Sequence, residues 1–500
     1  MKLTLLRLIA ATAVVCCATA FAKTPTYQAN TPESILTPDT IKTRIGALNF
    51  NDGTPTPETV ELVYDNLDFY RGVDTFLTGI PAASAYALME GMKEVGMGKF
   101  SLGLYEEMLD ARSLWLTPNT TTLYGLAEID VKNGPVVMEV PPGVLGPIAS
   151  AYFKWVTDVG FTGPDGGKGG SYLFIPPGYE GEIPSEGYHV IPTTSFRNAL
   201  FMRAFVIDND IPKTVKHVRA NWKLYPYAKA DNPPNQHFID LTHKQYNTIH
   251  ANNYDFYNEL NDLVQYEADS AFSDDLRTQW AGIGIQKGHK FAPDARMKKI
   301  LVEAAAVGNA TARAMSYKPR HEKNYGWDNR RWTNPFYFGG HTFSKDGVVD
   351  LEARTFFHYM AIGVTPAMAN PQVGQGSVYA FTAEDKNGEF LMGDHVYSVT
   401  LPANIPAENF WSFNVYSNQT RSLLETDQIE AGLDSLTRDI QPNEDGSYTI
   451  WFSAEAPAGK ESNWVQTMPG KSWSTILRLY SPGKEWFDGS WVPGDIIRHD

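Results

Sequence analysis

A glycine-rich segment, residues 163–170, has the residue types that an anion site needs. It contains five glycines, which let successive backbone N–H groups turn toward one point. Lys168, between Gly167 and Gly169, would add a positive charge there. The spacing differs from a Walker motif, and no Ser or Thr directly follows Lys168. The segment therefore predicts either a binding site for an anion such as phosphate or a plain glycine-rich hairpin loop.

Two carboxylates accompany this segment. Asp158 precedes it and Asp165 lies within it. Carboxylate oxygens suit Ca²⁺ or Mg²⁺, and a pair of carboxyl groups can also act as general acid and base. The alternative is that both are solvated side chains of turns, where aspartate is common. Both are candidate catalytic residues, and the identity of any metal is left open.

A third group lies in the segment 351–360, where Arg354 and His358 are four residues apart. This spacing places both on one face of a helix. Because Phe356, Phe357 and Tyr359 surround it in the sequence, Arg354 is either a buried ion-pair partner or an anchor for an anionic ligand.

Asn119 and Tyr124 lie in a polar turn that leads into a β-prone run. Together with Thr121 and Thr122 they offer several hydrogen-bonding groups in one place, which makes Asn119 and Tyr124 candidates for substrate binding. Turn building by Asn and Thr explains the same residues.

Asp240, His243 and His250 would lie within about 80° of one another on a continuous helix. Such a stripe could ligate a metal or shuttle protons, although the step from His243 to His250 is too long for one ion. A polar surface or a polar contact between helices is the alternative.

Several classes of chemistry are excluded by composition. The only cysteines are Cys16 and Cys17, both inside an N-terminal leader, so the mature chain would have no thiol chemistry and no disulfides. No Gly-x-Ser-x-Gly elbow or dinucleotide-binding fingerprint occurs. The formal net charge of −15 argues against nucleic acid and anionic membrane surfaces as partners.

The leader, residues 1–22, is typical of a secretory signal peptide. Lys2 and Arg7 precede an apolar stretch, and Ala20 and Ala22 provide small residues next to a cleavage point. We therefore expect a periplasmic or secreted protein. No later stretch has the length of a transmembrane helix, so no membrane insertion is expected after cleavage.

The elements that would position these residues differ along the chain. Residues 23–55 are rich in Thr and Pro and predict an extended arm, which could wrap onto a neighbouring subunit of a homo-oligomer. A helix is predicted to begin at Thr56 and Pro57. Gly79, Ile80 and Pro81 predict a break before a second helix over 82–95.

Short β-prone runs with Gly and Pro turns dominate two regions of the chain. We expect a mainly β fold with a helical middle region, made of two antiparallel β-sandwich (jelly-roll-like) domains plus helical segments. The expected strands are 123–129, 136–140, 151–159, 172–175, 190–207, 378–381, 395–401, 411–416, 448–452 and 475–480. The expected divisions are 1–22 (signal peptide), 23–112 (arm and helices), 113–207 (sandwich), 208–325 (helical) and 326–500 (sandwich).

Particular runs resemble a bacterial two-domain family. TPNTTTLY at 117–124 with GPVV at 134–137 resembles domain of unknown function 1254, and the glycine-rich segment followed by Tyr172 and Leu173 is similar to its longer subgroup. Residues 410–416, 445–447, 462–464 and 477–480 resemble domain of unknown function 1214, its usual partner. The resemblance covers nearly all of the mature chain and implies two β-sandwiches flanking a helical region, with no settled activity. The family often has Asp where this chain has Thr121.

Two functions follow as hypotheses. The first is an exported hydrolase of a small anionic compound, for which a phosphate ester is one candidate. Lys168, Gly167 and Gly169 would hold the anion with help from Arg354, and Asp158 or Asp165 would act as acid/base or bind a divalent cation (Ca or Mg). The alternative is a non-enzymatic ligand-binding or structural β-sandwich protein of the cell envelope, in which the sandwiches frame an aromatic cleft or an oligomer contact.

Overall fold

The computed structural model describes residues 26–436 and 439–500. Contacts divide the chain into two compact units, Met1–Asn66 and Leu67–Asp500. The predicted signal peptide, residues 1–22, lies outside the described residues. In the part of the chain that the structure describes, no helix is both long enough and apolar enough to cross a bilayer.

The first unit holds a small antiparallel sheet where an extended arm was expected. Its strands are β1 (Thr40–Thr43), β2 (Gly46–Asn51) and β3 (Thr54–Pro55), and a short 3₁₀ turn, η1 (Glu33–Ile35), precedes them. Helix α1 (Pro57–Glu94) begins here as predicted, because the Thr59 N–H donates to Thr56 Oγ1 at 3.3 Å. The Thr59 hydroxyl also accepts the Asn49 N–H at 2.8 Å, which ties the sheet to the helix start.

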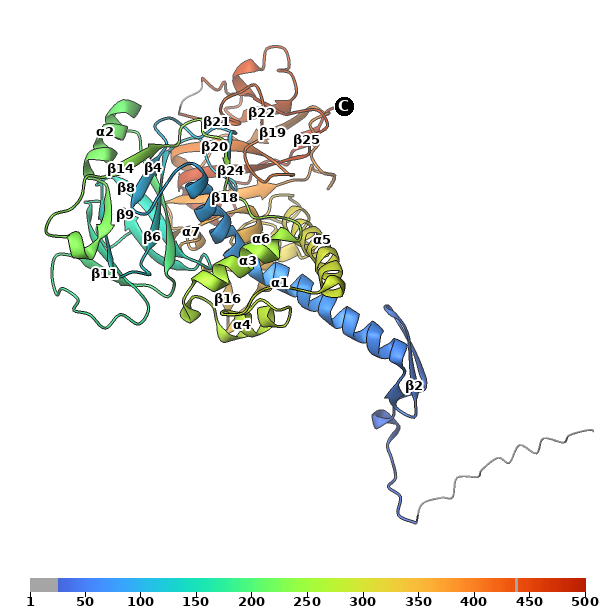
Figure 1. Ribbon diagram of the computed structural model, residues 1–500. Helices are drawn as coiled ribbons and strands as arrows, with labels where there is room; N and C mark the ends of the chain where they lie inside the picture. The colour runs from blue at the N-terminus through green and yellow to red at the C-terminus, as the bar shows by residue number, and fades with distance from the viewer. Residues whose placement is uncertain (1–25, 437–438) are drawn as a thin grey trace, which may run out of the picture. The chain divides into compact units, whose positions relative to one another are not determined.

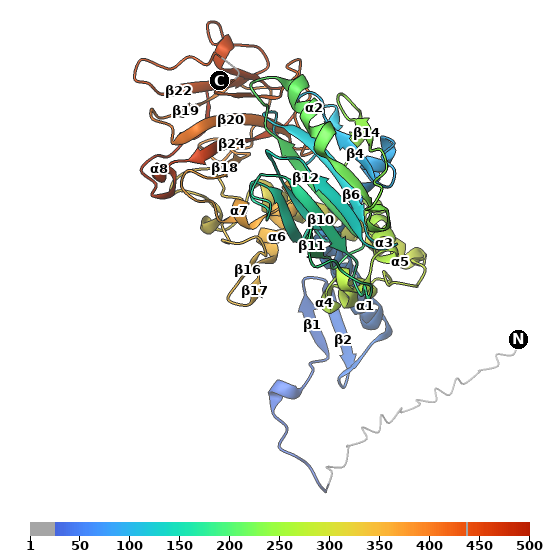
Figure 2. The ribbon, with the colours of Figure 1, turned by 90° about the vertical axis from the view of Figure 1, so that its left-hand side faces the viewer.

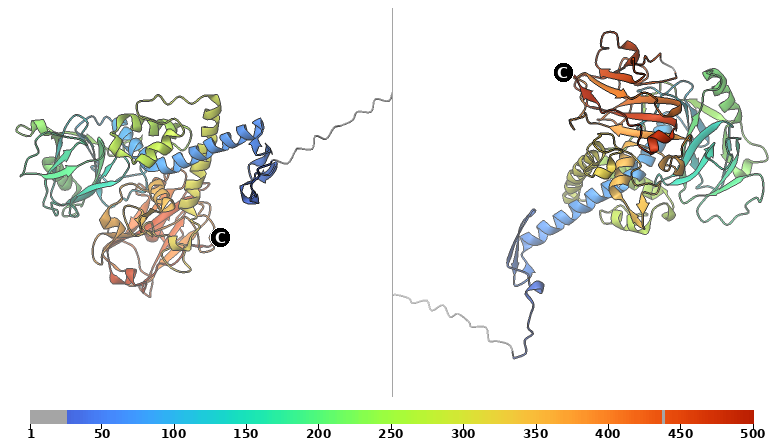
Figure 3. Two further views of the ribbon diagram at one scale, coloured as in Figure 1. Left: turned by 90° about the horizontal axis from the view of Figure 1, so that it is seen from below. Right: turned by 180° about the vertical axis from the view of Figure 1, so that it is seen from behind.

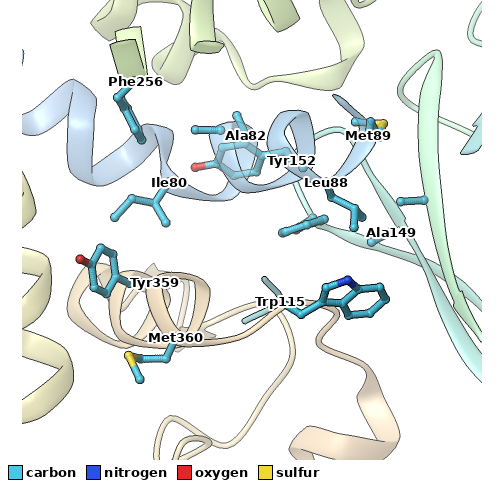
Figure 4. Packing of buried hydrophobic residues seen from close by; sticks show 14 of the residues in the cluster. Ile80, Ala82, Leu88, Met89, Trp115, Ala149, Tyr152, Phe256, Tyr359 and Met360 are labelled. Atoms are coloured by element: carbon cyan, nitrogen blue, oxygen red, sulfur yellow. The ribbon is translucent and has the colours of Figure 1, made fainter. Parts of the chain in front are cut away.

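The predicted break at Pro81 is wrong, because α1 continues through it to Glu94. Proline removes one helical hydrogen bond, yet the turns around it are completely buried. Figure 4 shows Ile80, Ala82, Leu88 and Met89 projecting from this part of α1 into a core shared with Trp115 and Met360. Packing of this apolar surface outweighs the local signal for a break.

Two sheets in the first half of the second unit share one hydrophobic core (Figures 1 and 2). The larger has the order β14-β4-β6-β12-β8-β9 and the smaller the order β11-β10-β7-β13. Alternate residues of β12, Leu200 and Met202, point into this core, whereas Phe201 and Arg203 lie on the opposite face of the larger sheet. The strands are β4 (Ser101–Leu104), β6 (Leu123–Asp130), β7 (Val136–Val140), β8 (Val144–Ser150), β9 (Trp155–Gly160), β10 (Gly170–Ile175), β11 (His189–Pro192), β12 (Arg197–Ala204), β13 (Lys223–Pro226) and β14 (His237–Asp240).

Two further sheets near the C-terminus share a second core, which contains Trp332, Phe413 and Trp473. Their orders are β18-β24-β20-β21 and β23-β22-β19-β25. The strands are β18 (Ser377–Thr382), β19 (Tyr397–Leu401), β20 (Ala407–Ser417), β21 (Gly432–Asp434), β22 (Tyr448–Ser453), β23 (Trp464–Gln466), β24 (Trp473–Pro482) and β25 (Ile497–Arg498). Each strand predicted in this half overlaps an observed strand, because its apolar residues alternate between clear turn signals.

The remaining helices lie between and around the sheet pairs (Figure 1). They are α2 (Ile211–Asn221), α3 (Asp255–Tyr266), α4 (Asp274–Ala281), α5 (Ala295–Tyr317), α6 (Leu351–Met360), α7 (Pro366–Ala369) and α8 (Lys484–Phe487), with the two-residue strands β5 (Ser113–Leu114), β15 (Tyr246–Asn247), β16 (Ser344–Lys345) and β17 (Val348–Val349) among them. α5 crosses the part of α1 that belongs to the second unit (Figure 3). A Cβ at Gly72 of α1 would lie only 2.7 Å from that of Ala304, so the absence of a side chain permits this approach.

The fold is mixed α/β rather than mainly β, with 26% helix and 28% strand in several mostly antiparallel sheets. None of the sheets is closed or curled. The difference arises because α1 is one long helix and because α3 to α6 form a substantial part of the largest core. Residues 208–325 also supply β13 and β14 to the first sheet pair, so this segment is not purely helical.

Candidate functional site

The glycine-rich segment forms a tight loop between β9 and β10, and its polar groups mostly bond to one another. Asp165 is buried, and its carboxylate accepts the N–H groups of Gly160 and Gly169 at 2.7 and 3.0 Å and the Tyr172 hydroxyl. The N–H groups of Gly163, Gly166 and Lys168 donate to carbonyls of the same loop. Since these amide groups already have partners, the geometry favours the hairpin-loop interpretation over an anion site.

The residues predicted to work with this loop do not converge on it. The Lys168 side chain is exposed, and Gly167 turns with a φ of +79°. Asp158 is buried on β9 and accepts a hydrogen bond from Trp155 Nε1 at 2.9 Å. No hydrogen bond joins Asp158 to Asp165 among the described residues, and those residues contain no group of three or more His, Cys, Asp or Glu side chains placed to hold a metal ion.

Asn119 and Tyr124 build a turn and also line a cavity. The Asn119 amide oxygen accepts hydrogen bonds from the Thr121 N–H at 3.0 Å and from the Thr122 hydroxyl at 3.1 Å. The Tyr124 hydroxyl accepts the Asn119 N–H at 3.2 Å. Both interpretations of this motif therefore have support, because the residues that shape the turn are held at the wall of a cavity.

This cavity has a volume of about 120 Å³ and lies between β6 and β12 on one side and α6, β18 and β24 on the other. We refer to it as the Arg203 cavity. Its walls are mainly apolar and aromatic, and the polar side chains among them include two arginines, Arg203 and Arg478. The aromatic residues in its lining are Trp115, Tyr124, Phe201, Phe336, Phe356, Phe357, Tyr379 and Phe381.

Arg203 lies opposite Tyr124 in the register of β12 and β6. Among the described residues it forms no salt bridge, since no carboxylate oxygen lies within 4.0 Å of its guanidinium. Burial opposes its charge, but the phenol groups of Tyr379, Tyr124 and Tyr480 raise the pKa of Arg203 above its ordinary value. The guanidinium therefore keeps its positive charge at every physiological pH.

Arg478 has a more structural position in the same cavity. Its guanidinium donates to the Asn414 amide oxygen at 2.9 Å, the Tyr416 hydroxyl at 2.8 Å and the Thr117 carbonyl at 3.0 Å. These bonds hold the turn before β6 against β20 and β24. Arg203 is consequently the arginine of the cavity whose N–H groups are available to bind a ligand.

Asp158 lies beside both this cavity and the start of the glycine-rich loop, where a Cβ at Gly163 would lie 2.6 Å from the Asp158 carbonyl oxygen. It pairs with Pro147 across β8 and β9, so both side chains lie on the same face of the sheet, and Pro147 lines the cavity. Burial raises the pKa of Asp158, while hydrogen bonds from Trp155 and Thr162 and the charge of Arg203 act in the opposite direction. The carboxyl group therefore holds its proton to a higher pH than an exposed aspartate.

Arg354 and His358 lie on helix α6, as their spacing predicted. They line a different cavity from the Arg203 cavity. Phe356 and Met360, on the opposite side of α6, line the Arg203 cavity. Arg354 and the residues at Asn119 are thus not brought together in one site.

The predicted helical stripe of Asp240, His243 and His250 is wrong. Asp240 ends strand β14, His243 has a φ of +56°, and β15 lies between His243 and His250. His243 Nδ1 lies 2.6 Å from a carboxylate oxygen of Asp110, and His250 is buried beside Arg421. The hydrophobic periodicity of this segment is too weak to distinguish a helix from strands that pair with distant residues.

Residue spacing in the sequence does not single out Arg203. It interrupts an apolar run, residues 199–204, in a predicted strand. A single arginine in a strand whose alternate residues face a core indicates a candidate binding site, because arginine is rarely buried without a partner. That signal identifies the residue but not the elements that close the cavity around it.

Comparisons with known proteins agree with this architecture. Residues 102–226 match a family model described as Protein of unknown function (DUF1254), and residues 376–484 match Protein of unknown function (DUF1214). The chain carries DUF1254 followed by DUF1214. The Arg203 cavity has walls from both, since Arg203 lies in the DUF1254 region and Arg478 in the DUF1214 region.

One solved structure of a similar protein shows the same overall fold, and a second solved structure is more distantly similar. The VPA0106 protein from Vibrio parahaemolyticus is 16% identical, with a TM-score of 0.52 over 87% of this chain and 100% of its own. An uncharacterized protein from Burkholderia cenocepacia is 12% identical, with a TM-score of 0.39 over 87% of this chain and 96% of its own. No curated protein matches the chain.

Proposed function

We propose that this protein binds a small organic anion in the Arg203 cavity. The observation that carries the proposal is an arginine that faces an aromatic cavity and has no carboxylate partner within 4.0 Å among the described residues. Arg203 is half-buried. A charge partly removed from water without a counter-ion is unfavourable, and a ligand carboxylate would supply the counter-ion through two parallel N–H···O bonds. This is the ligand-binding alternative of the two functions that the sequence suggests.

The size and walls of the cavity indicate the class of anion. A volume of about 120 Å³ is similar to that of an engineered apolar cavity of roughly 150 Å³ that takes up benzene. Its aromatic lining suits a flat or short apolar body, and Arg203 suits a single carboxylate at one end. Benzoate and hexanoate have this combination.

The direct test is calorimetric titration of the protein with benzoate, hexanoate and benzyl alcohol. We expect the two carboxylates to bind and the neutral alcohol to bind at least ten times more weakly. Arg203→Met should weaken benzoate binding by about 1.5–3 kcal/mol, roughly 10- to 100-fold, since a hydrogen bond to a charged group has this value. Arg44→Met is the matched control, because Arg44 is exposed and outside the cavity. Equal benzoate affinity in the Arg203→Met protein, or equal binding of benzyl alcohol, would refute the proposal.

Hydrolysis of an ester of such an anion is a second candidate, supported by the buried Asp158 on the same sheet face as Pro147. In this reaction the oxygen of water bonds to the acyl or phosphoryl centre and the bond to the alcohol oxygen breaks. The proton of Asp158 passes to that oxygen, and one proton of the attacking water returns to Asp158. The products are the alcohol and the acid, which releases its remaining proton to solvent and is held by Arg203 as the anion.

Asp158→Asn separates the two candidates. The asparagine has the same shape but no acidic proton, so benzoate binding should persist under both candidates. Under hydrolysis, release of phenol from phenyl acetate and phenyl phosphate should fall by about 10²–10⁴-fold. We would assay both esters with and without Mg²⁺ or Ca²⁺. Absence of any Asp158-dependent product release would leave ligand binding as the function.

Export and the finer architecture belong to the same proposal. We infer that each pair of sheets with a shared core is an open β-sandwich and that residues 1–22 direct the chain to the periplasm or the medium. N-terminal sequencing of the protein from a periplasmic fraction should begin near Lys23. A chain that begins at residue 1 in that host would overturn the export proposal.

A further inference from the structure

A second cavity, of about 680 Å³, lies between the turn that joins β8 to β9 and helices α4 and α6. We call it the Arg354 cavity, because Arg354 of α6 lines it together with Lys154 of the turn. Cavities of roughly 300–1,000 Å³ are of the size that holds small-molecule ligands.

Two cations of this cavity converge on one aromatic ring. Lys154 Nζ and the guanidinium carbon of Arg354 each lie 5.7 Å from the ring centroid of Tyr152. Tyr152 itself is buried, its hydroxyl donates to the Thr78 carbonyl at 2.8 Å, and burial raises its pKa to about 12. The ring is therefore neutral, and it brings two positive charges together without neutralising either.

Neither cation has a carboxylate partner within 4.0 Å among the described residues. Two acidic side chains are nearby: Asp275 lines the cavity but is exposed in the first turn of α4, and Asp74 of α1 accepts a hydrogen bond from the Gln279 amide. Both come from α1 and α4, whereas the cations come from the turn and α6. Burial raises the pKa of Asp74 and the charge of Arg354 acts against that rise, so Asp74 lies within electrostatic reach of Arg354 without pairing with it. The two cations lie on the same wall of the cavity.

The turn that presents Lys154 is strained. Phe153 is almost completely buried and has a φ of +49°, a conformation that bulky residues rarely adopt. The Ser150 N–H donates to the Lys154 carbonyl at 2.9 Å, and the Ser150 hydroxyl accepts the Lys154 N–H at 3.2 Å, which closes the turn. Such strain persists where the surrounding structure requires one geometry, and it is frequent at ligand sites.

The inner end of the cavity is electrically neutral. His358 is only 3% exposed, and its Nδ1 is buried without a hydrogen-bond partner among the described residues. Burial, with the charge of Arg354, lowers the pKa of His358 to about 3, so the imidazole is neutral. The positive charge of the cavity therefore comes from Lys154 and Arg354.

At its outer end the cavity has a flat apolar surface. Trp155 is 36% exposed, and its ring meets that of His341 edge-on at 5.6 Å. A ligand ring could stack on the free face of the indole while its charged end reached the cations.

We propose that the Arg354 cavity is a second ligand site, which takes a phosphate monoester that carries a flat ring. A phosphate monoester has a charge of about −1.5 to −2 near neutral pH, which matches two cations, and its several acceptor oxygens match the donors of Lys154 and Arg354 together. This site is independent of the Arg203 cavity, and its ligand differs in charge from the monoanion proposed there.

The experiment is calorimetric titration of the whole protein with phenyl phosphate, inorganic phosphate, phthalate and benzoate. We expect phenyl phosphate to bind most tightly, inorganic phosphate more weakly, and the affinity for phenyl phosphate to fall with added salt. Lys154→Met and Arg354→Met should each weaken binding by on the order of tenfold or more. Lys154→Arg retains the charge on an exposed turn and should restore most of the affinity.

A control variant makes the result decisive. Lys168→Met removes an exposed lysine of the glycine-rich loop, outside both cavities. It should bind phenyl phosphate as the parent protein does. The proposal is overturned if Lys154→Met binds phenyl phosphate unchanged, if Lys168→Met abolishes binding, or if phthalate binds as tightly as phenyl phosphate. Because Lys154 is exposed, its replacement does not threaten folding, and near-ultraviolet circular dichroism verifies this.

Discussion

Replacing His358 with Phe is expected to make the unfolding free energy less sensitive to acid. The imidazole is surrounded by rings, with centroids of Phe343, Phe357 and Phe153 at 5.1, 5.3 and 6.0 Å. A phenyl group has a similar shape and suits this environment. It also removes an unpaired Nδ1, which should stabilise the folded state by about 1 kcal/mol at pH 7.5.

The size of the effect follows from the pKa of His358, about 3 in the folded state against 6.5 for an ordinary histidine. Above pH 6.5 the group is neutral in both states and contributes nothing to the pH dependence. Below 6.5 the unfolded chain binds a proton that the folded chain does not, so stability falls as pH falls toward the folded pKa. Between pH 7.5 and 5.0 the loss from this one histidine is about 2 kcal/mol, at roughly 1.4 kcal/mol per pH unit below 6.5.

Urea denaturation followed by tryptophan fluorescence at pH 7.5, 6.3 and 5.0 measures the effect. Carboxyl groups and the second buried histidine, His250, titrate in parent and variant alike, so the difference between the two proteins isolates His358. His289→Phe is the control, because solvent reaches this exposed imidazole in both the folded and the unfolded chain. If His358→Phe loses as much stability as the parent between pH 7.5 and 5.0, the imidazole is not held neutral and the reasoning fails.

Two predictions concern stability. Asp165→Asn leaves one carbonyl oxygen as acceptor for several donors, so at least one buried donor loses its partner. Thermal unfolding should show that the free energy of unfolding falls by about 1–3 kcal/mol. The same change at exposed Asp231 should have little effect, and an equal loss there would contradict the role of Asp165. Gly91→Ala places a Cβ 2.2 Å from the Asn247 carbonyl oxygen and should destabilise the protein by about 1–3 kcal/mol, whereas a Cβ at Gly98 makes only an ordinary contact, 3.8 Å from Ser101 Oγ. Equal stability of these two variants would show that α1 does not pack as closely as the structure indicates.

The sequence by itself determined the elements whose signals are local. The runs at 378–381, 411–416 and 475–480 alternate between strong turn signals, and all three lie in strands. Thr56 and Pro57 began a helix as expected, and Arg354 with His358 lie on one helix. These features depend on residues close together in the chain, so propensity and spacing are sufficient to predict them.

Only the tertiary structure decided which of these elements meet. The Arg203 cavity is built from residues 115–124, 201–203, 356–363 and 476–478, which are separated by up to several hundred positions. Pro81 stays inside a helix because residues distant in the sequence cover the surrounding turns. Asp240 lies in a strand because that strand pairs with β4, which is also distant in the sequence. The glycine-rich loop has the residue types of an anion site, yet its amide groups donate to the buried carboxylate of Asp165 and to carbonyls of the same loop. Packing and hydrogen bonding between remote segments set these outcomes, because their free energies exceed the local preferences that a sequence pattern records.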